Sequence, residues 1–140
     1  TLVRPDILAV MKKGEHSSTF GGNPLACAAG TATLHALTQD GLIENAKSMG
    51  EKFSHGLEEL KSKHKIIREV RGKGLMIGVE LKFEVKDILM EGIKNGLLLL
   101  YSGRNILRFL PPLVISEEDT VKTLQILDKL LTNEENRRNA

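Results

Sequence analysis

Residues 16–26 carry the sequence HSSTFGGNPLA, and the rest of the chain is organised around this stretch. Its hydroxyl side chains, paired glycines and proline are typical of a loop that turns into a helix. Asn23 suits an N-cap, and Pro24 suits the first helical position, where a missing N–H loses no hydrogen bond. Gly21 and Gly22 allow close approach of another group. Hydroxyls beside the positive end of a helix dipole predict an anion site that favours phosphate, although ordinary capping turns share this composition.

The bulk composition describes a single globular domain. The chain has 140 residues, of which 41% are hydrophobic and 27% charged, enough to form a real core. The net charge of +2 is too small to indicate nucleic acid, and no apolar run approaches the length of a membrane span. We therefore expect neither a nucleic-acid nor a membrane partner. Cys27 is the single cysteine, which fits a reducing cytoplasm.

Helical periodicity accounts for most of the chain. A short N-terminal arm helix is expected to begin near Pro5. Residues 42–63 show the clearest pattern, because apolar side chains recur every three or four positions and charged ones occupy the opposite face. Ser116 is expected to cap the last helix, whose first turn is acidic. The remaining predicted helices are residues 24–38 and residues 84–95, the second closed by Gly96.

Four β-rich runs predict a small sheet. Residues 66–71 and 75–81 are joined by Gly-Lys-Gly, interpreted as a turn because the P-loop spacing and its Ser or Thr are absent. Residues 97–101 are predicted to form a buried strand, and residues 104–109 form another that ends at two prolines. The predicted fold is α+β, with three or four mainly antiparallel strands covered by helices and a short N-terminal helical arm.

Three motifs in the same order resemble the class III pyridoxal-phosphate-dependent aminotransferases, above all the ornithine and acetylornithine enzymes. They are residues 16–26, residues 71–80 (RGKGLMIGVE) and residues 106–113 (ILRFLPPL). The likeness runs from residue 1 to about residue 131 and covers the last third of such an enzyme. One departure is Ser17, which stands where the family usually has Gly.

The resemblance implies a domain organisation and an activity. Residues 1–22 would be an arm and loop left from the large cofactor domain, residues 23–132 the small C-terminal domain of a fold-type I enzyme, and residues 133–140 a disordered tail. The whole enzyme would move an amino group between an ornithine- or acetylornithine-like amino acid and 2-oxoglutarate, as a homodimer in amino-acid biosynthesis. The choice among ornithine, acetylornithine and acetyl-lysine stays open.

Two groups of residues are implicated in binding. The resemblance implies that Thr19 first, and Ser18 second, contact the phosphate of pyridoxal phosphate held by the neighbouring subunit; ordinary capping hydroxyls are the alternative. Arg108 lies in an apolar strand, where a guanidinium is expensive to bury unless it is paired. Its planar fork suits a carboxylate, and the resemblance implies the substrate α-carboxylate; a buried structural salt bridge is the alternative. Arg71, at a strand end, is interpreted as structural.

No metal site is expected, because the four histidines lack a metal-binding spacing. His35, His55 and His64 are predicted to be surface residues of helices, and His16 to shape the loop of residues 16–26.

The cofactor requires a lysine, and the lysines here are poor candidates. Lys12 and Lys13 fall just before the loop of residues 16–26, whereas the resemblance places the Schiff-base lysine, and the aspartate partner of the ring nitrogen, upstream of Thr1. No catalytic residue is therefore expected in this chain, and the chain alone is predicted to be inactive. A non-catalytic remnant, or a module that dimerises or binds a partner, is the alternative function.

Overall fold

In a computed structural model, which describes residues 3–12, 14–15 and 17–139, the centre of the fold is one antiparallel sheet. Its strand order is β1-β2-β4-β3, so the chain pairs β4 with β2 and leaves β3 at the edge. The strands are β1 (Ile67–Lys73), β2 (Met76–Leu81), β3 (Leu100–Ser102) and β4 (Ile106–Phe109). The predicted small, mainly antiparallel sheet of an α+β domain is confirmed.

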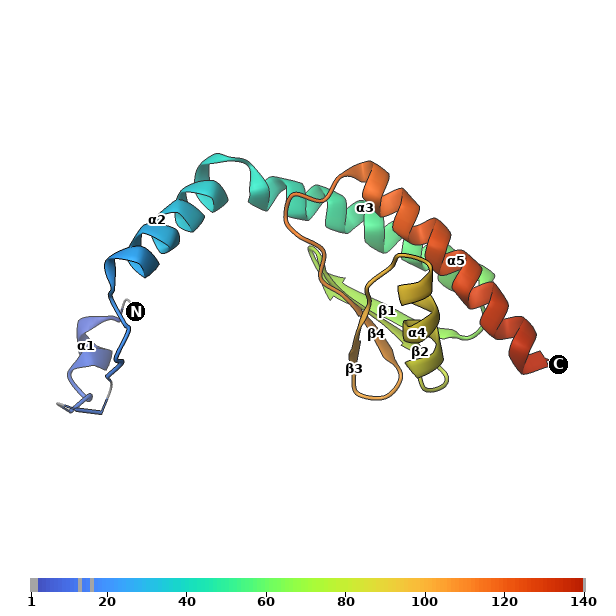
Figure 1. The fold of residues 1–140 in the computed structure, drawn as a ribbon, viewed down its shortest axis with the longest axis horizontal. Helices are drawn as coiled ribbons and strands as arrows, with labels where there is room; N and C mark the ends of the chain where they lie inside the picture. The colour runs from blue at the N-terminus through green and yellow to red at the C-terminus, as the bar shows by residue number, and fades with distance from the viewer. Residues whose placement is uncertain (1–2, 13, 16, 140) are drawn as a thin grey trace.

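Three helices cover one face of this sheet (Figure 1). They are α3 (Leu42–Lys63), α4 (Lys86–Lys94) and α5 (Glu117–Asn139). Alternate residues of the central strands point toward the helices and are buried, including Val79 of β2 and Leu107 of β4. Phe53 of α3 meets Phe109 of β4 edge to face, with ring centroids 5.2 Å apart. In the part of the chain that the structure describes, no helix packs on the opposite face of the sheet.

The hairpin between β1 and β2 explains part of the glycine-rich motif. The turn falls at Gly74 and Leu75, one step later than predicted, so Gly72 and Lys73 belong to β1. Gly74 has φ +55°, a left-handed conformation that glycine adopts without strain. A Cβ added at Gly50 of α3 would lie 2.8 Å from Gly74 Cα, so the helix packs directly on the backbone of the turn.

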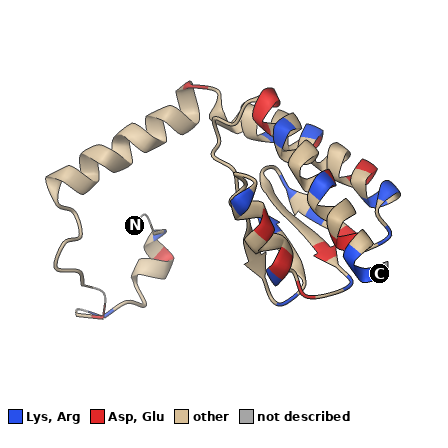
Figure 2. Ribbon diagram, turned by 45° about the vertical axis from the view of Figure 1, so that its right-hand side comes forward, with Lys and Arg blue, Asp and Glu red and all other residues tan. Residues whose placement is uncertain are grey.

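The N-terminal part of the chain projects away from this body (Figure 1). It contains α1 (Pro5–Leu8), the predicted arm helix, and α2 (Pro24–Gln39). The predicted cap is confirmed, since Ala26 N donates to Asn23 Oδ1 at 2.9 Å. No residue of α2 is buried, and none is Asp, Glu, Lys or Arg, as the uniform tan of this helix in Figure 2 shows. Among the described residues no helix is long and apolar enough to cross a membrane.

The predicted buried strand at residues 97–101 was wrong in position and burial. The strand is β3, and all three of its residues are exposed. It pairs with β4 on one side only, so it is an edge strand. The apolar residues that suggested burial are Leu97 and Leu99, which precede the strand and pack half-buried against the core.

The predicted disordered tail was also wrong for residues 133–139, because α5 continues to Asn139. Polar composition suggested disorder, but these polar residues have partners within the fold. Glu134 is buried and accepts from Arg138 Nε at 2.5 Å, while the Arg138 guanidinium lies 3.5 Å from the centre of the Phe83 ring. These contacts give the last turns of the helix a place to pack.

Candidate functional site

Arg108 lies on the face of the sheet that no helix covers. Strand pairing places Gly78 of β2 between Arg108 of β4 and Arg71 of β1, so the three form a row across the sheet. This row crosses a hollow of about 560 Å³. The hollow is lined by Arg71, Gly72, Lys73, Met76, Ile77, Gly78, Ser102, Ile106 and Arg108. Arg108 itself is half-buried.

The acidic residues of this face already have partners. Glu80 accepts from Arg71 Nη1 at 2.9 Å and from Arg68 Nη1 at 2.7 Å, and Glu69 accepts from Arg71 Nη1 at 2.5 Å. These hydrogen bonds, with Arg71 first, hold the pKa of Glu80 below its usual range, and Glu80 raises the pKa of Arg71. The pairing agrees with the structural interpretation of Arg71.

Arg108 differs from the other two arginines of this face. Within the described residues its guanidinium has neither a hydrogen-bond partner nor a carboxylate within ion-pair distance, whereas those of Arg68 and Arg71 are paired. The predicted alternative, a buried structural salt bridge, is therefore not what these residues form. A guanidinium presents five N–H donors and binds a carboxylate with two parallel bonds. The site thus offers a planar cation, without a protein counter-ion among these residues, beside a hollow.

The loop before α2 carries the other predicted residues. Gly21 N donates to Ser18 Oγ at 3.0 Å, so this hydroxyl shapes the loop as an acceptor and keeps its own proton for donation. Thr19 is exposed beside it. The Ala26 N–H is already bonded to Asn23 Oδ1, so this amide at the start of α2 is not available to an anion. His16 lies outside the described residues.

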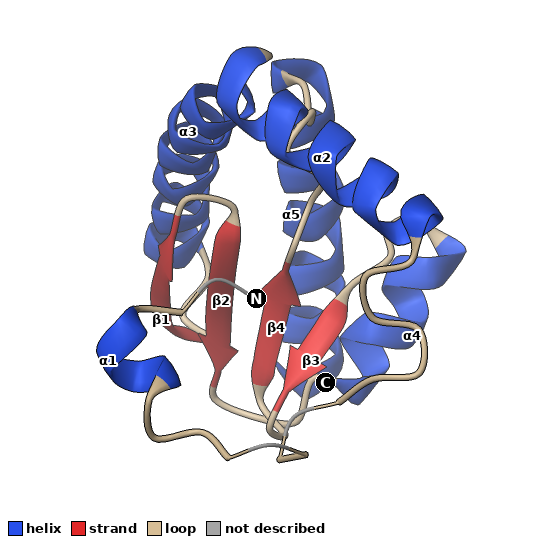
Figure 3. Cartoon of the chain, turned by 90° about the vertical axis from the view of Figure 1, so that its left-hand side faces the viewer, coloured by secondary structure: helices blue, strands red, loops and turns tan. Residues whose placement is uncertain are grey.

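The loop and Arg108 are not brought together by this fold. They are separated along the chain by α2 and α3, which join end to end at an angle (Figure 1). Figure 3 shows the arm and α2 on the side toward which the uncovered face of the sheet is turned. The hydroxyls of Ser18 and Thr19 are exposed on one side of the loop and do not enclose a site by themselves.

His64 is a correction to the sequence prediction. It is not a surface residue but only 2% exposed, at the end of α3. Its Nδ1 lies 2.8 Å from Glu135 Oε2 and its Nε2 2.6 Å from Asp128 Oδ1, and Lys63 Nζ also bonds Asp128 at 2.6 Å. Lys63 first, then His64, hold the pKa of Asp128 below its usual range. The available signal was the two acids of α5, which lie seven residues apart on one helix face.

The other described histidines, His35 and His55, are exposed, as predicted. Over the described residues no group of three or more His, Cys, Asp or Glu side chains is placed to hold a metal ion.

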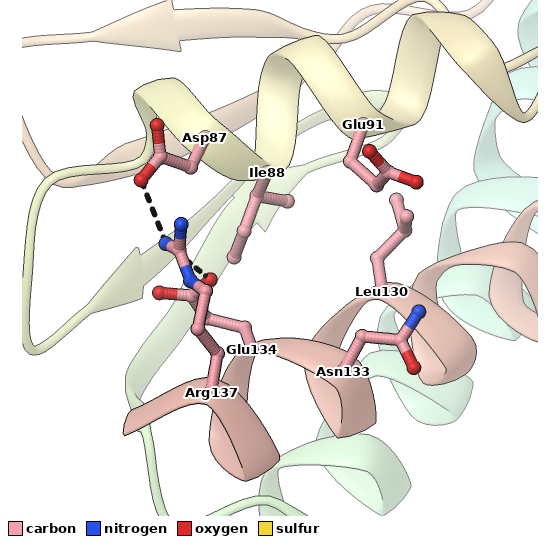
Figure 4. Close-up of a pocket in the computed structure, with 7 residues that line it drawn as sticks. All are labelled: Asp87, Ile88, Glu91, Leu130, Asn133, Glu134 and Arg137. Carbon is pink, nitrogen blue, oxygen red and sulfur yellow. Dashed lines mark hydrogen bonds and ion pairs between the residues drawn. The ribbon is translucent and has the colours of Figure 1, made fainter. Parts of the chain in front are cut away.

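A second cavity, of about 210 Å³, lies between α4 and α5 (Figure 4). Arg137 bridges its two walls, with Nη2 2.6 Å from Asp87 Oδ2 and 2.7 Å from Glu134 Oε2. Arg137 lowers the pKa of Asp87. None of the predicted site residues lines this cavity, and the ion pair of Arg137 with Asp87 joins the end of α5 to α4. We interpret it as part of the structure of the helix layer.

The lysines are placed poorly for covalent attachment of a cofactor. No lysine in the described part of the chain is buried, and Lys12 and Lys73 are both exposed. They lack the burial by which a cofactor-binding lysine is activated as a nucleophile. Lys13 lies outside the described residues.

Comparison with known proteins identifies the family. A sequence model described as aminotransferase class-III matches residues 1–131. The chain belongs to the class III aminotransferases. This confirms the resemblance of the three motifs, and enzymes of this family depend on pyridoxal phosphate.

Individual class III aminotransferases agree over nearly the whole chain. An acetylornithine aminotransferase of Caldanaerobacter subterraneus subsp. tengcongensis is 48% identical over 132 residues, which are 94% of this chain and 34% of that relative. The crystal structure of an acetylornithine aminotransferase from Elizabethkingia anophelis has a TM-score of 0.86 at 36% identity, over 94% of this chain and 36% of that one. A Plasmodium falciparum ornithine delta-aminotransferase has a TM-score of 0.86 at 38% identity, over 94% and 35%. The chain spans about a third of the length of these proteins.

Proposed function

We propose that this chain provides the substrate-carboxylate site, and a cofactor-phosphate contact, of an ornithine- or acetylornithine-type aminotransferase. The whole enzyme moves an amino group from such an amino acid to 2-oxoglutarate. Arg108 carries the proposal: it is half-buried on the uncovered face of the sheet, beside a hollow, while the neighbouring acids Glu69 and Glu80 are bound to other arginines. Both amino-acid and 2-oxo-acid substrates carry a carboxylate that fits this group.

Arg108 orients the substrate. Two parallel hydrogen bonds from its guanidinium fix both the position and the plane of the α-carboxylate. Its strand neighbours Leu107 and Phe109 are buried in the core, so the backbone that carries the guanidinium is held rigidly. A rigid anchor at one end of the substrate limits where the reacting amino or oxo carbon lies.

Thr19 and Ser18 are assigned to the phosphate of the cofactor. Their hydroxyls donate from an exposed loop, so the remaining phosphate contacts come from other groups, in our proposal those of the neighbouring subunit of a homodimer. Pyridoxal phosphate, when bound, supplies the electron sink for amino-group transfer. The division of the chain at residues 22 and 23, with the loop acting beside the large domain, is part of this proposal, as is a cytoplasmic location, which the lone Cys27 favours.

The chain alone is expected to lack transaminase activity. A catalytic lysine needs burial or a nearby positive field to lose its proton at neutral pH, and no described lysine has the burial. Incubation with pyridoxal phosphate, borohydride reduction and peptide mapping test this expectation. Stoichiometric labelling of one lysine, together with amino transfer to 2-oxoglutarate, would overturn it.

The role of Arg108 is tested by carboxylate binding to the chain itself. Titration of the ¹⁵N-labelled protein with 2-oxoglutarate, against sodium chloride of equal ionic strength, is expected to shift the amides of β2 and β4. Arg108→Gln removes these shifts, and Arg104→Gln is the matched control, because Arg104 is exposed and pairs with Glu84 at 3.7 Å. Loss of folding stability in Arg108→Gln, with 2-oxoglutarate shifts unchanged, would assign Arg108 to the structure instead.

A binding or dimerisation module is the second candidate function. It is favoured by α2, which is uncharged and has no buried residue. Sedimentation across a wide concentration range separates the two. Stable self-association in a protein that shows no response to carboxylates would favour the module.

A further inference from the structure

Gly72, Gly74 and Gly78 lie in or beside the β1–β2 hairpin, and only two of them are required by the backbone. A Cβ at Gly72 would collide with the carbonyl oxygen of Met76 in the paired strand. Gly74 has φ +55°, which strains any residue with a side chain. Gly78 has neither property. Its φ is outside the left-handed region, and the nearest backbone atom to an added Cβ is Arg71 O, at an ordinary contact distance of 3.8 Å.

Gly78 therefore weakens its strand although neither its φ nor the surrounding backbone requires glycine there, and the closest contact of an added Cβ is with the flexible side chain of Ile106. Glycine in a strand interior loses more conformational freedom on folding than other residues and provides no side chain to pack. Position 78 is in β2, which pairs with a neighbour on each side. Glycine at such a position is characteristic of a place where a ligand or another backbone approaches closely. No other segment of the described chain lies over it: the nearest side-chain atom to an added Cβ is Ile106 Cγ2, at 3.3 Å.

The position of Gly78 indicates what approaches it. It is directly opposite Arg108 in the register of β2 and β4, and it belongs to the lining of the same hollow. Along the uncovered face its neighbours are the charged residues Arg71, Arg108 and Glu80 and two apolar ones, Met76 on its own strand and Ile106 on β4. A ligand whose carboxylate is held by Arg108 would extend over a floor that has no side chain at position 78.

We infer that Gly78 is a specificity-determining residue that makes room for the carbon chain of the substrate next to its carboxylate. The inference rests on the proposed carboxylate role of Arg108. The ligand class is an unbranched amino or 2-oxo acid, because methylene groups gain from contact with Met76 and Ile106. A side chain at position 78 would occupy the space of those methylenes and would also crowd Ile106.

The experiment compares two carboxylates of different length on Gly78→Ala and Gly78→Val. Acetate ends at its methyl group and reaches only Arg108, whereas 2-oxoglutarate extends over the floor. The initial slope of amide shift against ligand concentration, at constant ionic strength, measures relative affinity for each. We expect Gly78→Val to weaken 2-oxoglutarate at least about tenfold and acetate by less than about twofold, with Gly78→Ala between wild type and Val. Amide dispersion and thermal midpoint establish that the variants are folded; Gly78→Ala adds a single methyl group and remains informative if Val unfolds.

The outcomes separate the two proposals. Equal loss of both ligands would overturn the inference, because it would mean that position 78 acts on Arg108 or on the fold and not on the chain of the ligand. Unchanged 2-oxoglutarate binding in both variants, with binding still lost in Arg108→Gln, would overturn the inference and leave the role of Arg108 intact. Wild-type shifts that do not depend on Arg108 would overturn the proposed function and this inference with it.

Discussion

The two long helices α2 and α3 follow one another in the chain and differ in almost every physical respect. Helix α3 has charged residues along one face and a buried stripe on the other, formed by Met49, Gly50, Phe53, Gly56, Leu57 and Leu60. Helix α2 has no Asp, Glu, Lys or Arg and no buried residue. An amphipathic helix is expected to pack by its apolar stripe, as α3 does on the sheet. Helix α2 lacks the charged face that a solvent-exposed helix usually has. Its composition is therefore that of a buried helix, although its position is exposed.

This contrast indicates which helix contributes to the folding stability of the chain. Burial of apolar surface is the main favourable contribution to folding, and among the two helices only α3 makes it within this chain. The body formed by α3, α4, α5 and the sheet is therefore expected to keep the same free energy of unfolding when the apolar side chains of α2 are substituted. Three experiments test this difference between α2 and α3.

The largest effect is expected from matched leucine truncations. Leu57 of α3 is fully buried, whereas Leu34 of α2 is 64% exposed. Leu57→Ala is expected to lower the free energy of unfolding by about 3 kcal/mol, through lost transfer energy and a cavity. Leu34→Ala is expected to change it by less than about 0.5 kcal/mol. Urea denaturation measures both. A large loss for Leu34→Ala that disappears on dilution would show that α2 is covered by a second copy in solution.

Matched glycine substitutions are expected to have opposite signs. A Cβ at Gly50 of α3 would meet the backbone of Gly74, which cannot rotate away, so Gly50→Ala is expected to destabilise by about 2 kcal/mol. A Cβ at Gly30 of α2 would meet no atom within 4 Å, so Gly30→Ala is expected to raise the helicity of α2 and to stabilise it by about 1 kcal/mol. Circular dichroism and urea denaturation check these effects. A loss from Gly30→Ala similar to that from Gly50→Ala would contradict the exposed position of α2.

The periodic parts of the fold were predictable from the sequence. The stripe of α3, the Asn23–Pro24 start of α2 and the strands β1, β2 and β4 follow from local spacing and lie within a few residues of where they were expected. Strand β3 is the exception, because it lies later than residues 97–101 and is exposed. Local spacing fails where a partner is distant in the chain. His64 was assigned to the surface because nothing near it in the sequence indicated a partner. Its two carboxylate partners are in α5, 64 and 71 residues later. The tail of α5 was misassigned for the same reason, since its polar residues bind α4 and Phe83.

The candidate site was predictable only in part. An arginine among apolar strand residues made Arg108 conspicuous, and the loop of residues 16–26 was distinctive in composition. The sequence does not show that Glu69 and Glu80 are bound by Arg68 and Arg71, which is what leaves Arg108 without a described partner. That depends on strand register, and a shift of one residue would move these side chains to the other face.

The smallest effect concerns acid, which is expected to act on the end of α3 and not on the arm. Asp128 receives hydrogen bonds from Lys63 Nζ and lies against His64, and these groups, Lys63 first, lower its pKa in the folded protein. A carboxyl whose folded pKa is below its unfolded value binds fewer protons when folded, so it contributes stability above the unfolded pKa, near pH 4. That contribution falls as the pH drops through the folded pKa. Because the pair is partly exposed, we expect about 1 kcal/mol at neutral pH.

The test compares the acid dependence of wild type, Asp128→Asn and Lys63→Gln. Unfolding free energies from urea titrations at pH 7 and at pH 2.5 are expected to differ by about 1 kcal/mol less in Asp128→Asn than in wild type. Lys63→Gln removes the largest cause of the lowered pKa and is expected to fall between them. Truncation before residue 40 removes α2, which carries no carboxylate, and also Asp6 and Glu15, whose partners Arg4 and Lys12 lie in the removed arm. It is therefore expected to leave the acid dependence of the body unchanged. An acid dependence that is the same in Asp128→Asn as in wild type, but is abolished by the truncation, would place the acid-sensitive contact in the arm and reverse the comparison between the two helices.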